Sequence, residues 1–318
     1  MEKREVLLMG RIPDMPKAET DRLFDTYTVH ALHLSEDPDA LVESVKDRIT
    51  VIATNGVLGA SADFMSNLPN LQAIISFGAG MDNIDLVYAK DKGIQVSNTP
   101  GVLNDDVANM AVALLLGISR EIVEADRYVR RRDWVTKGKM GLQKSIRNKK
   151  VGILGLGGIG RDLAKKLEAF GCDIAYHNRR ENPEVPYRYY PNLLDMAKDC
   201  EYLIVICPAT ADTIKAVNRE VIDALGPEGT LINIARGTIV DEEALVPALQ
   251  EGRLGAFASD VFANEPHVPE ALFEMPNVIL IPHLGSATAE TRRAMGELVL
   301  RNLERFFAKE PLETPVAL

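Results

Sequence analysis

Three ionisable side chains in the second half of the chain stand at or just beyond apolar runs that resemble strands. Arg236 lies in NIARGTIVDEEAL, Glu265 in SDVFANEP and His283 in VILIPHLGSATAETR. In open parallel sheets, the carboxyl ends of such strands converge on the ligand crevice. If the three meet there, Arg236 can clamp a carboxylate, His283 can move a proton, and Glu265 can orient the imidazole and stabilise its charged form. That set suits the reduction of a 2-oxo acid.

Each of the three residues also has a simpler interpretation. Arg236 can belong to an ion pair at a strand end, Glu265 can be a solvated loop charge, and His283 can be a histidine whose hydrogen bonds are satisfied structurally. The spacing alone does not decide between the two interpretations.

A glycine motif precedes this set. Gly155, Gly157 and Gly160 form GxGxxG directly after the apolar run VGILGL and directly before the helix-like GRDLAKKLEAF. The first glycine permits a tight turn, the second lets the backbone approach a pyrophosphate, and the third allows close helix packing. An ordinary glycine turn is the alternative. The motif predicts that a dinucleotide is bound by Gly155, Gly157, Gly158, Ile159 and Gly160.

The stretch YHNRR follows at the end of the next strand-like run, CDIAYHN. An Asp or Glu there would bind the ribose 2′-hydroxyl of NAD, but the chain has Asn178, Arg179 and Arg180. Two guanidinium groups can meet a 2′-phosphate with charge-assisted hydrogen bonds, so NADP(H) is the predicted cofactor, with NAD(H) as the alternative. Solvated strand-end charges, or Glu181 turning inward to replace the missing acid, remain open.

The elements that position these residues follow from the pattern of apolar runs. Up to about residue 98, short apolar stretches alternate with polar, helix-compatible segments, which is the rhythm of a parallel sheet with crossover helices. Residues at helical spacing from Val107 to Ile122, behind the candidate cap Asn104, predict one long amphipathic helix. A second alternation begins at KKVGILGLGGIG, and a helix ended by Pro311 closes the chain. The fold class is therefore α/β with two doubly wound parallel sheets.

Composition narrows the function further. The net charge of −10 disfavours broad nucleic-acid binding, because phosphate binding needs a basic surface. Cys172, Cys200 and Cys207 form no CxxC pair and are expected to be buried structural thiols, Cys172 and Cys207 within strands, so no metal site is predicted. Apolar runs are too short for a signal peptide or a membrane span, and a cytoplasmic protein is expected.

Taken together, these motifs resemble the D-2-hydroxyacid dehydrogenase family. The glycine motif, the ARG segment, the NEP segment and PHLGSAT occur in the order typical of that family, and SFGAGMDNIDL and VSNTPGVLNDDVA extend the match over nearly the whole chain. The resemblance is greatest to the glyoxylate, hydroxypyruvate and hydroxyphenylpyruvate reductase branch. It implies a flavodoxin-like substrate domain, residues 1–98 with 287–318, a Rossmann nucleotide domain, residues 99–286, and a homodimer.

The resemblance also assigns roles to residues. Arg236 would bind the substrate carboxylate and carbonyl, His283 would be the general acid, and Glu265 would be its partner. Backbone N–H groups of Ala79 and Gly80 would bind the substrate carboxylate. Asp260 would face the nicotinamide carboxamide, and the remaining cofactor contacts would come from Pro208, Thr213 and Ala235.

The predicted function is the NADPH-dependent reduction of glyoxylate, hydroxypyruvate or hydroxyphenylpyruvate to glycolate or a D-2-hydroxy acid. One alternative is an NAD-dependent dehydrogenase of another D-2-hydroxy acid. Another is a non-catalytic NAD(P)-sensing dimer, which the complete set of Arg, Glu and His disfavours. A methyltransferase is the weakest, because its glycine loop would leave that set unexplained.

Overall fold

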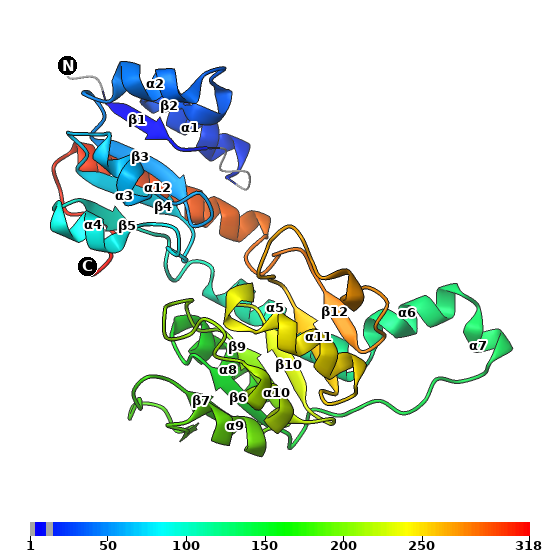
Figure 1. The fold of residues 1–318 in the computed structure, drawn as a ribbon. Coiled ribbons are helices and arrows are strands. Elements are labelled where there is room, and N and C mark those ends of the chain that lie inside the picture. The colour runs from blue at the N-terminus through cyan, green and yellow to red at the C-terminus, as the bar shows by residue number, and fades with distance from the viewer. Residues whose placement is uncertain (1–3, 11–14) are drawn as a thin grey trace. The chain divides into compact units, whose positions relative to one another are not determined.

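The structure is a computed structural model that describes residues 4–10 and 15–318. Contacts along the chain divide it into two units (Figure 1). The first combines the described residues up to Leu103 with Ser286–Leu318, and the second is Asn104–Gly285. Each unit has its own parallel sheet, so the predicted α/β class with two doubly wound sheets is confirmed.

The sheet of the first unit has the flavodoxin-like strand order β2-β1-β3-β4-β5. Its strands are apolar along most of their length because helices cover both faces of such a sheet. They are β1 (Glu5–Leu8), β2 (Thr28–Ala31), β3 (Val51–Asn55), β4 (Ala73–Phe77) and β5 (Gln95–Ser97). The helices before the second unit are α1 (Lys17–Thr26), η1 (Leu32–Leu34), α2 (Pro38–Val45), α3 (Ala62–Ser66) and α4 (Leu86–Asp91).

The C-terminal helix completes the first unit. As predicted, the segment forms one helix, α12 (Ala289–Phe307), and Thr288 caps it by accepting a hydrogen bond from the Thr291 N–H. The helix packs against β4 and α1 and buries one face, including Met295 and Val299. The end of the chain therefore contributes to the same core as its beginning.

The sheet of the second unit has the order β12-β11-β10-β9-β6-β7-β8, which is the Rossmann order extended by one strand. Its strands are β6 (Lys150–Leu154), β7 (Asp173–His177), β8 (Arg188–Tyr189), β9 (Tyr202–Val205), β10 (Thr230–Asn233), β11 (Ala256–Ser259) and β12 (Val278–Leu280). The helices between them are α8 (Gly158–Ala169), α9 (Leu193–Asp199), α10 (Arg219–Leu225), η2 (Gly237–Ile239), α11 (Glu242–Gln250) and η3 (Glu270–Leu272). The order reverses between β6 and β9, where such folds bind their ligand.

The prediction of one long helix after residue 104 is wrong. The segment forms α5 (Asn104–Ser119), α6 (Ile122–Arg130) and α7 (Asp133–Thr136), with Glu121 and Arg132 in left-handed conformations between them. Leu115 is buried against the sheet, whereas Ile122 is 55% exposed. The apolar residues keep their helical spacing beyond Ser119, but there the helix no longer packs against the sheet. The spacing therefore predicts a longer helix than the core can bury. Asn104, predicted as a cap, is the first helical residue.

All three cysteines are free. Cys200 and Cys207 are buried as predicted, and burial raises the pKa of the Cys200 thiol to about 12 and that of Cys207 to about 11. Cys172 is only half-buried. Cys172 precedes β7 and Cys207 follows β9, so neither lies within a strand, because the apolar runs there are longer than the paired segments.

Neither a candidate membrane span nor a metal-binding cluster is found in residues 4–10 and 15–318. No helix in this described part of the chain is long and apolar enough to cross a membrane. Within the same residues, no group of three or more His, Cys, Asp or Glu side chains is arranged to hold a metal ion.

Candidate active site

The glycine loop leaves β6 and begins α8 in the way that the motif predicts. Gly155 has φ +108°, and its N–H donates to the His177 carbonyl oxygen at 3.0 Å. A Cβ at Gly155 would lie 2.6 Å from Cys207 Cα, and one at Gly160 would lie 2.3 Å from the Gly155 carbonyl oxygen. Glycine is therefore required at both positions by packing within the protein.

Gly157 differs from its neighbours because no protein packing requires it. A Cβ built there meets no protein atom within 4 Å, and the residue is the exposed N-cap of α8. Gly158 and Ile159 form the start of this 12-residue helix, whose first N–H groups point out of it and favour an anion. The loop fits the pyrophosphate of a dinucleotide, which needs a close approach to backbone that a side chain would obstruct.

The end of β7 positions the pair of arginines. Asn178 Oδ1 accepts a hydrogen bond from the Leu156 N–H at 2.7 Å, so its side chain fastens this strand end to the glycine loop. Arg179 and Arg180 follow and are exposed. Neither guanidinium has a hydrogen bond or ion pair with another residue in the described part of the chain. Both are thus available to an anionic group near the glycine loop.

The loop after β9 lies at the point where the strand order reverses. Thr213 Oγ1 donates to the Pro208 carbonyl oxygen at 2.8 Å and accepts from the Thr210 N–H at 2.7 Å. These bonds close residues 208–213 into a compact turn beside β6. The predicted cofactor residues Pro208 and Thr213 therefore belong to one rigid turn next to the glycine loop.

Arg236 is presented by a turn that a buried asparagine holds. Asn233, the last residue of β10, is 1% exposed, and its side chain accepts from the Ala235 N–H at 3.1 Å and donates to the Arg236 carbonyl oxygen at 2.9 Å. Arg236 Nη1 donates to the Ala235 carbonyl oxygen at 2.7 Å. Sequence reasoning missed Asn233; its position at the end of an apolar strand, three residues before Arg236, was the available signal.

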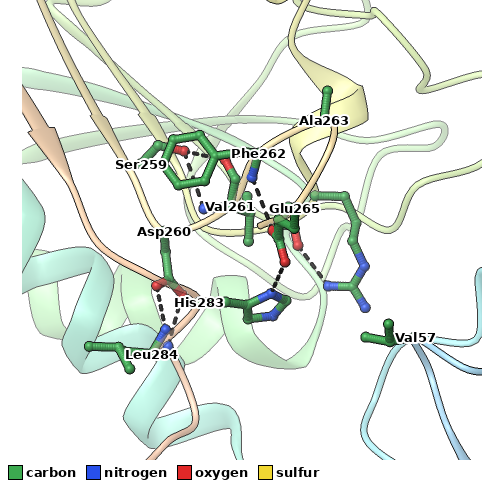
Figure 2. A network of polar contacts seen from close by, with 12 residues as sticks. Val57, Ser259, Asp260, Val261, Phe262, Ala263, Glu265, His283 and Leu284 are labelled. Atoms are coloured by element: carbon green, nitrogen blue, oxygen red, sulfur yellow. Dashed lines mark hydrogen bonds and ion pairs between the residues drawn. The ribbon is translucent and has the colours of Figure 1, made fainter. Parts of the chain in front are cut away.

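His283 and Glu265 form the centre of the site. Figure 2 shows the imidazole pointing at the carboxylate, and His283 Nδ1 lies 2.8 Å from Glu265 Oε2. The second carboxylate oxygen, Oε1, accepts the Phe262 N–H at 3.0 Å. Because Nδ1 faces the carboxylate, Nε2 is the ring nitrogen left for proton transfer. The predicted pair is thus brought together.

The charge of Glu265 is favoured by its surroundings. Burial raises the pKa of its carboxyl, but the hydrogen bonds from His283 and the Phe262 N–H, with the positive charges of His283 and Arg236, lower it further than burial raises it. The net pKa lies below the usual value for a glutamate. An anionic Glu265 stabilises the protonated imidazole beside it.

Asp260 holds the loop that carries His283. Its side chain is 1% exposed, and its two oxygens accept the Leu284 N–H at 2.5 Å and the Gly285 N–H at 2.8 Å, as Figure 2 shows for Leu284. Its carbonyl oxygen accepts the His283 N–H at 2.8 Å, which supports His283 in a left-handed conformation with φ 54°. Burial raises the pKa of Asp260 more than these bonds lower it. The predicted contact with a nicotinamide stays a prediction.

A second carboxylate, Glu242, was not anticipated from the sequence. Its Oε1 accepts the Ala263 N–H at 2.8 Å, and burial raises the pKa of this carboxyl above its usual value. The Gly237 backbone packs directly against the backbone of Phe262 and Ala263, since a Cβ at Gly237 would be 1.9 Å from the Phe262 carbonyl carbon. The turn that bears Arg236 and the loop that bears Glu265 are therefore locked together.

Ala79 and Gly80 belong to the first unit, in the loop after β4. The loop is fixed by Asn98, which donates to the Ala79 carbonyl oxygen at 3.0 Å, and a Cβ at Gly56 would be 2.6 Å from the Gly80 carbonyl oxygen. Within the described chain, the N–H groups of Ala79 and Gly80 have no hydrogen-bond acceptor. They are free to bind an anion, and the predicted contact with a substrate carboxylate stays a prediction.

The fold and geometry of the second unit define an α/β dinucleotide-binding protein with a site for carbonyl chemistry. Residues 112–285 match the family model described as D-isomer specific 2-hydroxyacid dehydrogenase, NAD binding domain. The chain belongs to the D-isomer-specific 2-hydroxyacid dehydrogenase family, which confirms the resemblance found in its motifs.

Named relatives agree over the full length. A glyoxylate/hydroxypyruvate reductase A of Arabidopsis thaliana is 46% identical over 316 residues, covering 99% of this chain and 100% of that protein. A hydroxyphenylpyruvate reductase of Plectranthus scutellarioides is 45% identical over 317 residues, again 99% and 100%. The crystal structure of an NADPH-dependent glyoxylate/hydroxypyruvate reductase from Sinorhizobium meliloti, in complex with NADP and malonate, aligns with a TM-score of 0.91 at 41% identity and covers 100% of this chain and 97% of that chain.

Proposed function

We propose that this protein reduces small 2-oxo acids, such as glyoxylate, hydroxypyruvate and hydroxyphenylpyruvate, with NADPH. The observation that carries the proposal is the 2.8 Å contact between His283 and Glu265. It lies at the carboxyl ends of the strands, where Arg236 and the glycine loop also follow their strands. A general acid with its carboxylate partner, an arginine and a dinucleotide site are the groups that such a reduction needs. The activities for which the relatives are named support the choice of substrates.

In this mechanism, each residue acts on one part of the substrate. When bound, the nicotinamide supplies a hydride to C2 of the 2-oxo acid. His283 donates a proton from Nε2 to the carbonyl oxygen as negative charge develops there. Glu265 holds Nδ1 and stabilises the protonated ring until the proton leaves, and Arg236 binds the carboxylate and stabilises the developing oxyanion. Hydride and proton together yield the 2-hydroxy acid.

The remaining substrate contacts would come from backbone N–H groups of the first unit. Residues 1–98 with 287–318 would form the substrate domain, and residues 99–286 would form the nucleotide domain. The free N–H groups of Ala79 and Gly80 would then bind the substrate carboxylate, because backbone N–H groups in a glycine loop can approach an anion closely.

NADP(H) is the proposed cofactor, with NAD(H) accepted less well. Arg179 and Arg180 are exposed beside Asn178, where an NAD-specific site carries a carboxylate. In a triple variant, Asn178→Asp with Arg179→Ala and Arg180→Ala, we expect the preference to reverse toward NADH. Steady-state kinetics with both cofactors measure it, and an undiminished preference for NADPH would contradict this assignment.

A homodimer formed through the segment 120–142 is part of the proposal. Figure 1 shows α6 and α7 extending away from the sheet of their own unit, and none of the α6 side chains, all of which are described, is buried. Large apolar side chains are exposed along this segment: Ile122, Val129, Trp134, Val135 and Leu142. Exposed apolar patches of this kind mark protein interfaces.

A cytoplasmic location remains a prediction that cell fractionation tests.

The direct test is an absorbance assay for the consumption of reduced nicotinamide. Purified protein is mixed with NADPH or NADH and with glyoxylate, hydroxypyruvate or hydroxyphenylpyruvate, one pair at a time. We expect turnover with at least one of these acids and faster turnover with NADPH. Cofactor binding without turnover of any of the three acids would reject the proposed activity and favour a sensing role.

A further inference from the structure

Residues 178–182, here called the arginine turn, are fixed to the sheet at their first residue. Asn178 is held twice: its side chain accepts the Leu156 N–H at 2.7 Å, and its carbonyl oxygen accepts the Tyr189 hydroxyl at 3.2 Å. Tyr189 is on β8, paired in register with Tyr176 on β7. The start of the turn is thus tied both to the glycine loop and to the edge strand.

The last residue of the turn is fixed by a second tyrosine. The Tyr176 hydroxyl accepts the Asn182 N–H at 2.8 Å and donates to the Asn182 carbonyl oxygen at 3.2 Å. Tyr176 is fully buried, and its ring lies 5.4 Å from that of Tyr189 between centroids. A buried side chain with few alternative rotamers therefore sets the position of the end of the turn.

Between these two anchors lie Arg179 and Arg180, the exposed cations of the proposed NADPH site. An exposed arginine loses rotamer freedom when it binds an anion, and a mobile backbone would add the cost of ordering the turn itself. Two tyrosine hydroxyls that hold the backbone in advance remove that second cost. The hydroxyls therefore strengthen the binding of a phosphate by the two arginines, and they do not strengthen the binding of the rest of the dinucleotide.

We propose that the hydroxyls of Tyr176 and Tyr189 are positioning groups that confer selectivity for NADPH by holding the arginine turn ready for the 2′-phosphate. Neither hydroxyl needs to touch the cofactor. The inference rests on the proposed function, because it assumes that the arginine turn binds a 2′-phosphate.

The test compares Tyr176→Phe and Tyr189→Phe with the wild-type protein. Calorimetric titration with NADP⁺ and NAD⁺ gives both dissociation constants without any turnover. Because each variant loses hydrogen bonds to the turn, we expect binding of NADP⁺ to weaken by about three- to tenfold and that of NAD⁺ by less than about twofold. In steady-state assays, KM for NADPH should rise while kcat stays within about twofold.

Tyr190→Phe is the matched control. The Tyr190 hydroxyl donates to Asp199, which lies outside the arginine turn and also accepts from Lys150 at the start of β6. We expect this variant to keep the wild-type ratio of the two dissociation constants. If Tyr176→Phe fails to fold, Tyr189→Phe decides, since its half-buried ring carries less of the core.

The outcomes separate this inference from the proposed function. A wild-type protein that binds NADP⁺ no better than NAD⁺ would reject the cofactor assignment itself. Two outcomes would overturn the positioning role alone. In the first, Tyr189→Phe keeps the wild-type ratio of the two dissociation constants. In the second, binding of NADP⁺ and of NAD⁺ weakens by the same factor in both variants.

Discussion

At the scale of single residues, His283 and Glu265 form a pair in which each side chain is held in place. The 2.8 Å contact fixes the ring, and the Phe262 N–H fixes the carboxylate. Residue types at strand ends predicted these two side chains, because such ends converge in a parallel sheet. Asn233 escaped prediction although it ends an apolar strand, because that position does not show which backbone groups its amide holds. Glu242 escaped prediction because it accepts a backbone N–H of a loop, and no sequence pattern marks that role.

His283→Ala tests the general acid. We expect kcat to fall by about 100- to 10,000-fold, because the proton donor is lost, while the dissociation constant for NADPH stays the same. Stopped-flow and steady-state kinetics measure both effects, and near wild-type turnover in the variant would show that His283 is not the acid.

Glu265→Gln tests the electrostatics of the pair. The pKa of Glu265 is lowered in the folded protein, so its charge contributes stability that is fully present above its unfolded pKa and is lost as pH falls through the folded value. We expect the difference in the free energy of unfolding between wild type and Glu265→Gln to be constant near neutrality and to shrink in acid, below about pH 4.5. Urea unfolding over a pH series measures it. A difference that grows as pH falls would contradict the lowered pKa.

At the scale of elements, the strand and helix order of both units was predictable, but the ends of helices were not. Apolar periodicity reports which face of a helix can be buried, and it cannot report where the neighbouring sheet stops. That is why the pattern through Ile122 predicted one helix, whereas α5 ends at Ser119. The ends of β6 and β7 were clearer, because Gly155 and Asn178 mark where the chain must leave the sheet, whereas the apolar run past β9 hid its end at Val205.

The start of α8 yields a prediction in which two glycines of one motif behave differently. Gly160→Ala places a Cβ 2.3 Å from the Gly155 carbonyl oxygen, so we expect a loss of stability of about 1–3 kcal/mol. Gly157→Ala meets no protein atom, so its thermal unfolding should match wild type. Binding of NADPH to Gly157→Ala should weaken by about tenfold or more, because the pyrophosphate loses close backbone contacts. Equal stability losses in both variants would contradict this division of roles.

At the scale of the whole molecule, the segment 120–142 is the feature that the isolated chain leaves unexplained. Trp134 is 60% exposed and Val135 is 83% exposed, on the short helix α7, whose one buried residue is the polar Asp133. Burying such side chains against a second copy would remove their apolar surface from water, which stabilises the dimer relative to the monomer. The family resemblance predicted a homodimer, and this exposed segment is the surface that we propose for it.

Trp134→Ser combined with Val135→Ser tests that surface. We expect the wild-type protein to elute with twice the mass of one chain in light-scattering chromatography, and the double variant to dissociate at low micromolar concentration because its apolar contacts are removed. Val87→Ser is the control, since Val87 is 72% exposed on α4 of the other unit and should leave the mass unchanged. A double variant that stays dimeric at all concentrations would move the interface elsewhere, and a monomeric wild type would remove the homodimer from the proposal. Because His283, Glu265 and Arg236 all lie in one chain, a dissociated double variant that still turns over would further show that the pair and its arginine act without the partner.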